Sequence, residues 1–420
     1  MLSNYLKIAF KVFLRRKIFT LISLFAISAT LVMLMVGVAI SDHIFGPAYP
    51  ETRADRTLMV SMLKASHSDA NRNSMSPTSY GFLDRYVRNL PHVEKVAISS
   101  HSLMALIQPV ISFHDGAQIK SALKRTDGVF WEILEAEFLE GQPYSIDDVE
   151  HGRYVAVINE ATSQAFFGQS SALGETIEIA GQRFRVVGVV ANVPAFRLAS
   201  FADIWVPVTT VPDLKALNYT SIPGAYEAMI LAESVADIPR IKEEFAYALT
   251  QVEFPNPERF NQVAGGADTL FESISRFMFS DDLSESHPQR LLAVMIALVV
   301  LFMVLPAISL VNINVSRIME RASEIGVRKS FGAASTTLIG QFVVENVLLS
   351  LMGGIIGIGF TEVVLYLLSN SYLIPYAEFH INYRVFVYGL LMAMFFGVFA
   401  GVYPAWKMSR LHPVEALRRK

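Results

Sequence analysis

The chain has 420 residues, of which 52% are hydrophobic and 17% are charged, with a formal net charge of -3. Soluble globular proteins carry roughly 25% charged residues, so this composition excludes an ordinary soluble chain. The 38 acidic residues, 35 basic residues and 18 prolines are too many for a wholly membrane-embedded protein, and they indicate a membrane protein with a large water-exposed part.

The first apolar segment covers residues 18–40 and has no charged residue in 23 positions. At about 1.5 Å per residue such a helix is about 35 Å long, which suffices for a hydrocarbon core of roughly 30 Å. Residues 1–17, which precede it, are basic and contain no acid. A cleaved signal peptide would have an apolar region of only about 7–15 residues, so we predict an uncleaved first membrane span.

A polar domain of mixed α/β character is predicted for residues 41–290, which hold 20 basic and 32 acidic residues. The hydrophobic spacing predicts two strand–helix patterns in it. They comprise a strand, helix and strand at residues 57–63, 77–89 and 93–99, and a strand and helix at residues 226–232 and 235–250. Because the patterns lie far apart in the chain, we expect one α/β layer with a second module inserted at about residues 116–215.

The inserted module is predicted to be rich in strands, with β-prone runs at residues 154–159, 175–180 and 183–190. Gly181 and Gln182 form a plausible hairpin turn between the last two runs. Residues 256–288 have a weak pattern, so the sequence predicts no element there.

Three more spans are predicted at residues 291–315, 338–368 and 385–406. Basic residues concentrate in both terminal segments, residues 1–17 and 407–420, and in the 316–337 link, whereas the 369–384 link contains Arg384 alone. Because basic residues are retained in the cytoplasm, both termini and the 316–337 link are predicted to be cytoplasmic. The 41–290 domain and the 369–384 loop then face outward.

Several chemistries find no support in the sequence. The phosphate-binding pattern G-x-x-x-x-G-K-[S/T] and the zinc pattern H-E-x-x-H do not occur, the nine histidines show no ligand-like pairing, and there is no cysteine. We therefore predict no catalytic residue, no cofactor-binding residue and no metal site, and no nucleic-acid partner. The chain is expected not to be an enzyme.

The most specific segment lies in the cytoplasmic link. About 20 residues between two spans are too few for a domain, and the pattern favours a short amphipathic helix on the membrane surface. Its apolar and charged side chains would contact a partner, while composition alone slightly favours a solvated loop that binds lipid headgroups. The residues concerned are Arg321, Glu324, Ile325, Gly326, Val327, Arg328, Lys329, Phe331, Gly332 and Ala333.

These residues resemble the R-x-x-E-I-G-[VI]-R-[KR]-[AS]-[LF]-G-A signature that members of the MacB/FtsX-type ABC permease superfamily carry between their second and third spans. The external domain is similar to the MacB periplasmic core in its order of short motifs. The matching segments are residues 126–130, 139–143, 155–160, 166–168, 173–174 and 186–189, and those outside the domain are residues 312–313, 341–345 and 403–418.

The resemblance implies an α-helical membrane protein with four transmembrane helices and a large α/β extracytoplasmic domain, in which a porter-like layer carries a strand-rich insert. It implies a multi-pass permease subunit of a type VII, mechanotransmitting ABC transporter in the bacterial inner membrane. The cytoplasmic signature would be the coupling helix that docks into a cytosolic ABC ATPase. A second permease copy or a related permease, a membrane-fusion adaptor and an outer-membrane channel are the further partners implied.

MacB itself carries an ATPase at its N-terminus, whereas this chain starts almost directly with its first span. We therefore expect ATP and magnesium to bind a partner chain, and no cofactor to bind this one.

A few residues within the spans stand out. Pro306 is expected to kink the second span because proline removes one helix hydrogen bond. Gly353 and Gly357 form a small-x-x-x-small pair that permits close helix packing, against another chain or against a helix of the same chain. Glu345 falls near the cytoplasmic boundary, where its side chain could reach the surface. Glu362 lies deeper, and a pair with a partner helix or an interface position near the outer leaflet is favoured over a role in ion or proton movement.

The sequence thus predicts that nothing crosses the bilayer through this chain, since its spans are almost wholly apolar. ATP hydrolysis by a separate subunit would change the conformation of the external domain and drive efflux of a periplasmic substrate through the adaptor and channel. Two alternatives stay open. One is a lipoprotein-release or FtsX-like transducer that regulates cell-wall hydrolases, and the other is an ATP-independent membrane sensor or scaffold.

Overall fold

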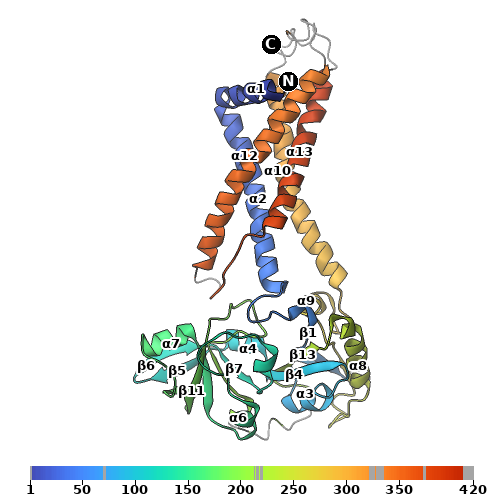
Figure 1. The fold of residues 1–420 in the computed structure, drawn as a ribbon. Helices are drawn as coiled ribbons and strands as arrows, with labels where there is room; N and C mark the ends of the chain where they lie inside the picture. The colour runs from blue at the N-terminus through green and yellow to red at the C-terminus, as the bar shows by residue number, and fades with distance from the viewer. Residues whose placement is uncertain are drawn as a thin grey trace. The chain divides into compact units, whose positions relative to one another are not determined.

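The structure, a computed structural model, describes residues 2–69, 72–211, 213, 217, 221–320, 327, 335–371 and 375–409. The chain divides into two compact units, each described by itself below (Figure 1). The helical unit comprises Met1–Ser41, Ala293–Asn370 and Phe379–Lys420. The α/β unit comprises Asp42–Leu292 and Ser371–Glu378.

Four long helices cover the four predicted spans. They are α2 (Lys17–Phe45), α10 (Pro288–Glu320), α12 (Ser335–Ser369) and α13 (Tyr383–Ser409). Within the described residues, α2 and the Gly340–Ser369 part of α12 are long and apolar enough to cross a membrane, and α10 and α13 contribute shorter apolar stretches. The count of four membrane spans therefore stays a prediction.

The basic N-terminus forms a helix of its own, α1 (Leu2–Arg15). Its apolar side chains pack with three of the long helices in one buried cluster, so this segment is more than the charged tail that the sequence predicted. The cluster contains Ala9, Phe13, Ile27, Leu31, Met35, Leu349 and Phe386.

The predicted α/β layer is confirmed. Its strands are β1 (Thr57–Val60), β13 (Tyr226–Ala232) and β4 (Val93–Ser100), paired antiparallel in that order. Two helices pack on it, α3 (Tyr80–Tyr86) and α8 (Ile238–Thr250). Phe82 and Leu83 of α3 and Ile241 and Phe245 of α8 are fully buried against strand residues, which is what the helical spacing of these apolar positions requires.

The strand-rich insert continues the same sheet instead of forming a separate one. The sheet has 11 strands in the order β1-β13-β4-β7-β12-β9-β11-β10-β5-β6, with β8 paired to β11. The strands that extend the sheet beyond β4 are β5 (Val110–His114), which precedes the predicted insert, and β6 (Ala117–Ser121), β7 (Leu123–Thr126), β8 (Phe138–Gly141), β9 (Val155–Asn159), β10 (Thr176–Ile179), β11 (Gln182–Val190) and β12 (Ile204–Pro207). The hairpin between β10 and β11 turns at Ala180 and Gly181, whose φ angles of 50° and 79° are those a tight I′ turn needs.

Shorter elements complete the α/β unit. A second sheet pairs β14 (Gln262–Ala264), β2 (Leu63–Ser66) and β3 (Asn73–Ser76). The remaining helices are α4 (Ser102–Ile107), α5 (Phe130–Ile133), α6 (Ile146–Glu150), α7 (Glu160–Phe167), α9 (Leu270–Phe279) and the 3₁₀ turns Ala54–Arg56, Val208–Thr210 and Val235–Asp237.

A buried ion pair joins the insert to the α/β layer. Lys124 on β7 and Glu227 on β13 are 0% and 2% exposed. The Lys124 Nζ donates to Glu227 Oε1 at 3.2 Å and to Ser102 Oγ at 2.7 Å, and the Ser102 backbone N–H donates to the same carboxylate. Burial lowers the pKa of Lys124, and the Glu227 carboxylate acts in the opposite direction.

The segment between α12 and α13 belongs in part to the α/β unit. The Tyr376 hydroxyl donates to Asp203 Oδ1 at 3.1 Å, and the Ala195 N–H donates to the Pro375 carbonyl at 3.0 Å. The Tyr376 ring packs against the cluster that contains Trp131 and Trp205. Residues 375–378 are therefore a built part of this unit and not a free connecting loop.

Candidate functional site

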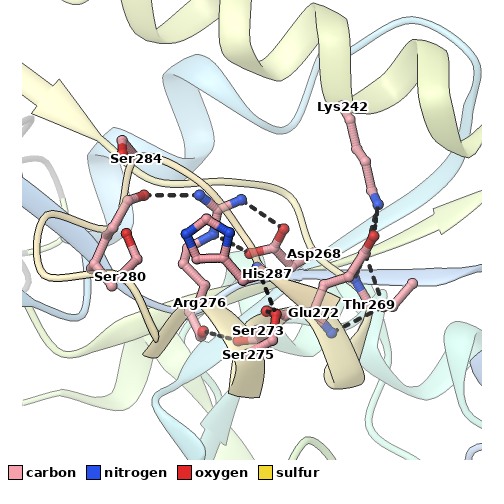
Figure 2. A network of polar contacts seen from close by, with 12 residues as sticks. Lys242, Asp268, Thr269, Glu272, Ser273, Ser275, Arg276, Ser280, Ser284 and His287 are labelled. Carbon is pink, nitrogen blue, oxygen red and sulfur yellow. Dashed lines mark hydrogen bonds and ion pairs between the residues drawn. The ribbon is translucent and has the colours of Figure 1, made fainter. Parts of the chain in front are cut away.

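The candidate site is the polar network around α9, drawn in Figure 2. The helix begins at a capping box, in which Thr269 Oγ1 accepts from the Glu272 N–H and the Glu272 carboxylate accepts from the Thr269 N–H at 3.0 Å. This reciprocal pair satisfies two of the backbone donors that a helix start leaves free. It explains locally why a helix starts here in a segment whose hydrophobic pattern is weak.

Arg276 ties α9 to the strand layer. Its Nε donates to Asp268 Oδ2 at 2.6 Å, its Nη2 donates to Asp268 Oδ1 at 2.9 Å, and its Nη1 donates to the Leu283 carbonyl at 2.8 Å. Asp268 in turn exchanges two backbone hydrogen bonds with Met59 of β1. Gly266 leaves the space for the guanidinium, because a Cβ there would lie 2.1 Å from Arg276 Nη2.

Two more contacts connect α9 with neighbouring helices. Lys242 of α8 donates to both Glu272 oxygens, at 2.5 and 2.6 Å. Burial raises the pKa of Glu272, but the hydrogen bonds from Lys242 and Thr269 outweigh it and lower the pKa overall. The Ser275 hydroxyl accepts from the N–H of His287, the residue before α10 begins. The network thus fixes α9 to β1, to α8 and to the start of α10.

The side chains of this network hold elements of the fold together. Its carboxylates and cations are paired with one another, and among the described residues no group of histidine, aspartate and glutamate side chains could hold a metal ion. Paired and buried charges of this kind fix geometry, because breaking one partner leaves the other buried and uncompensated. The network is therefore suited to hold α9, β1, α8 and His287 in a fixed arrangement.

The predicted coupling segment lies almost entirely outside the described residues. Of its members, Val327 is described, as a helical residue 46% exposed. That exposure suits an apolar anchor offered to a partner, and the role of the segment stays a prediction. Its other members are Arg321, Glu324, Ile325, Gly326, Arg328, Lys329, Phe331, Gly332 and Ala333.

The glycine pair packs within the chain. A Cβ at Gly353 of α12 would lie 2.6 Å from Ile27 Cγ2 of α2, and one at Gly357 would lie 3.3 Å from Leu31 Cβ. Of the two alternatives the sequence left open, the structure therefore shows packing against a helix of the same chain. The α10 helix is continuous through Pro306, and the kink expected there stays a prediction.

The two intramembrane acids differ in environment. Glu345 is 1% exposed and accepts a hydrogen bond from Gln341 Nε2 at 2.8 Å, so it is buried in the helical unit and does not reach the surface as expected. Glu362 is exposed on α12, beside exposed apolar residues such as Val363 and Tyr366. Its role as an interface residue or as a partner of another helix stays a prediction.

Replacing Gly353 with leucine is expected to destabilise the helical unit by about 1–3 kcal/mol, because the side chain would overlap Ile27. The matched control is Gly359→Leu on the same helix, where a Cβ has nothing within 4 Å. Both changes raise helix propensity equally. Thermal unfolding of the full chain in lipid nanodiscs should separate them, and equal melting temperatures would contradict the close contact.

Sequence reasoning missed α9 entirely. The signal was present in the four residues Thr269 to Glu272, which have the spacing of a capping box before an apolar run. The ion pairs could not have been found, since Asp268, Arg276 and Lys242 come together only through the fold.

Two family models match this chain. One describes a MacB-like periplasmic core domain and covers residues 18–247, more than half of the sequence. The other describes an FtsX-like permease C-terminal region and covers residues 296–413. Together they span both structural units.

Curated relatives agree with these matches. The macrolide export ATP-binding/permease protein MacB of Bdellovibrio bacteriovorus is 28% identical over 284 residues, which is 66% of this chain and 41% of that protein. The ABC transporter permease YknZ of Bacillus subtilis is 25% identical over 345 residues, 80% of this chain and 79% of that protein. The chain spans 41–51% of the length of the MacB relatives that it matches.

Solved structures with a similar fold include two extracytoplasmic domains. The extracellular domain of YknZ has 16% identity and a TM-score of 0.35, covering 46% of this chain and 93% of that one. The periplasmic region of MacB from Actinobacillus actinomycetemcomitans has 17% identity and a TM-score of 0.33, covering 45% and 81%.

The chain belongs to the family of MacB/FtsX-type ABC transporter permeases. It is a transporter component, and its α/β unit corresponds to the MacB-like core domain of that family.

Proposed function

We propose that this permease couples ATP hydrolysis on a separate cytosolic subunit to conformational change of the α/β unit, and that the change drives efflux of a periplasmic substrate. An adaptor and an outer-membrane channel would complete the path. The relatives named as macrolide export proteins support export as the direction of movement.

One observation carries the proposal. The helix α10 runs without interruption from Pro288 to Glu320, and Arg321, the first residue of the predicted coupling segment, follows directly. Its first residues belong to the α/β unit, and the residue before it is bonded to α9. A helix of 33 residues is about 50 Å long and stiff enough to pass an axial or tilting movement from one end to the other.

The experiment is a pull-down of the full chain from native membranes, read by mass spectrometry. We expect an ABC ATPase to co-purify, and Arg328→Glu to reduce its recovery roughly tenfold or more, because charge reversal in an interface costs several kcal/mol. Arg384→Glu, on an exposed arginine at the start of α13, is the matched control and should leave recovery unchanged.

Failure to recover an ATPase, or equal recovery with both variants, would overturn the coupling assignment. Co-purification of an adaptor and an outer-membrane channel would support efflux. A cell-wall hydrolase or a lipoprotein in their place would instead support the transducer alternative.

A further inference from the structure

The strand-rich insert and the α/β layer meet at a short junction within the sheet. β13 pairs with β4 along its seven residues, whereas β4 pairs with β7 at one position, where Ser99 lies opposite Thr126. Next to that position, the Ile98 N–H donates to the Asp127 carboxylate at 2.9 Å. The junction therefore depends on polar side chains as well as on backbone pairing.

His101 adds a titratable group to this junction. It connects β4 to α4, it is buried, and its backbone N–H donates to the Ala225 carbonyl at 2.8 Å. Its ring Nε2 lies 3.7 Å from Glu227 Oε2, beyond hydrogen-bond distance, and its Nδ1 is buried without a hydrogen-bond partner among the described residues. Because an imidazolium ring carries an N–H on both nitrogens, protonation would leave a buried donor at Nδ1 without an acceptor.

The charges around the His101 ring are already paired. Among the described residues, the charged side chains that act on this ring are Glu227 of β13 and Lys124 of β7, whose Nζ lies 3.2 Å from Glu227 Oε1. Glu51 acts on Lys124 more weakly than Glu227 does, and Arg125 lies on the opposite face of β7 because neighbouring strand residues alternate. A protonated His101 would therefore place two buried cations beside the one carboxylate of Glu227.

The balance of these effects favours a neutral His101 in the folded protein. Burial has the largest effect and lowers the pKa of His101, the Glu227 carboxylate raises it, and the Lys124 ammonium lowers it, so the pKa lies below its ordinary value. In an unfolded chain the histidine pKa is about 6.5. Below that pH the folded state binds fewer protons than the unfolded chain. Its stability is therefore complete above about pH 6.5 and is lost progressively as the pH falls.

We propose that His101 makes the junction between the insert and the α/β layer sensitive to acid, so that protonation of its ring weakens the contact of β4 and β13 with β7. Apolar residues of both modules, such as Met229 of β13 and Trp205 of β12, pack in one cluster, so the junction weakens without the modules separating. The core domain of this family is periplasmic and therefore meets the pH outside the cytoplasmic membrane. The inference concerns the stability of this unit and does not rest on the proposed transport function.

The test measures the melting temperature of the full chain in lipid nanodiscs at about pH 8 and at about pH 5.5, on either side of the ordinary histidine pKa. The signal is the fluorescence of the buried Trp131 and Trp205. At the lower pH an unfolded histidine is about ten-to-one protonated, so His101 should favour unfolding by up to about tenfold. The expected result is a fall of up to roughly 3–6 °C in the melting temperature that is due to His101.

Substitutions of histidine identify the group responsible. His101→Gln keeps a neutral polar side chain and should remove this part of the fall, whereas His151→Gln, at an exposed histidine after α6, should keep it. His101→Asn takes the place of the glutamine variant if that variant does not fold. The quantity compared is the difference between the two pH values, so a variant that is less stable at both still decides the question.

Lys124→Met should reverse the sign of the His101 effect. Without the ammonium, a protonated His101 becomes the cation that compensates Glu227, so the pKa of His101 should rise above its ordinary value. A raised pKa gives stability that is present at low pH and lost as the pH rises. The Lys124→Met chain should therefore melt at a higher temperature at about pH 5.5 than at about pH 8, and adding His101→Gln should reduce that gain.

Two outcomes would overturn the proposal. One is a fall on acidification that is equal in the wild type and in His101→Gln. The other is a gain on acidification in Lys124→Met that His101→Gln leaves unchanged, because the ring would then not respond to the charges beside it.

Discussion

Replacing Arg276 with methionine is expected to release α9 from β1 and to uncouple the start of α10 from the sheet. The change leaves the Asp268 carboxylate buried without its bidentate partner and the Leu283 carbonyl without its donor. Breaking one side of a buried pair costs about 3–5 kcal/mol. Amide hydrogens of α9 should then exchange about a hundredfold faster or more in the full chain in nanodiscs, as measured by mass spectrometry.

The matched control is Arg240→Met on α8, whose side chain is 67% exposed and faces Asp237 at 4.0 Å. An exposed pair of this kind contributes about 0–1 kcal/mol, so α9 should exchange as in the wild type. If the permease works as proposed, the Arg276 variant should still bind its ATPase and lose transport. Unchanged exchange in α9 would show that the network does not hold the helix.

Replacing Lys124 with methionine is the second change with a large expected effect. It leaves the Glu227 carboxylate buried at 2% exposure, with Ser102 as a remaining donor, and should destabilise the junction between the insert and the α/β layer by about 3–5 kcal/mol. The melting temperature of the full chain, followed by the fluorescence of the buried Trp131 and Trp205, is the measurement.

Lys120→Met, at an exposed position on β6, is the control and should melt as the wild type does. Adding Glu227→Gln to Lys124→Met removes the uncompensated charge and should recover part of the loss. A single variant as stable as the wild type would show that the pair contributes little to the junction.

Much of the fold could be predicted because it rests on periodic patterns. The apolar runs predicted the long helices. The hydrophobic spacing also predicted the strand at Tyr226–Ala232 and the buried face of the helix that carries Phe245. The joining of both modules into one sheet could not be predicted, because it depends on long-range pairing such as Ser99 with Thr126. The hydrophobic pattern of one strand does not specify which distant strand pairs with it.

The candidate site was predicted less well, for a related reason. Sequence motifs singled out the coupling segment, which resembles a family signature, but α9 has no signature beyond its capping box. Glu345, which was expected to reach the surface, is buried and accepts a hydrogen bond from Gln341, one helical turn away.

The docking of residues 375–378 onto the α/β unit sets an order of events during biosynthesis. Tyr376 completes the hydrogen bonding of Asp203 and packs on the cluster around Trp131, yet it is translated after the whole of residues 293–370. At about 5–20 residues per second, a ribosome needs roughly 4–16 s for that stretch. The α/β unit therefore lacks the Tyr376 contacts until α12 and the residues that follow it have been translated.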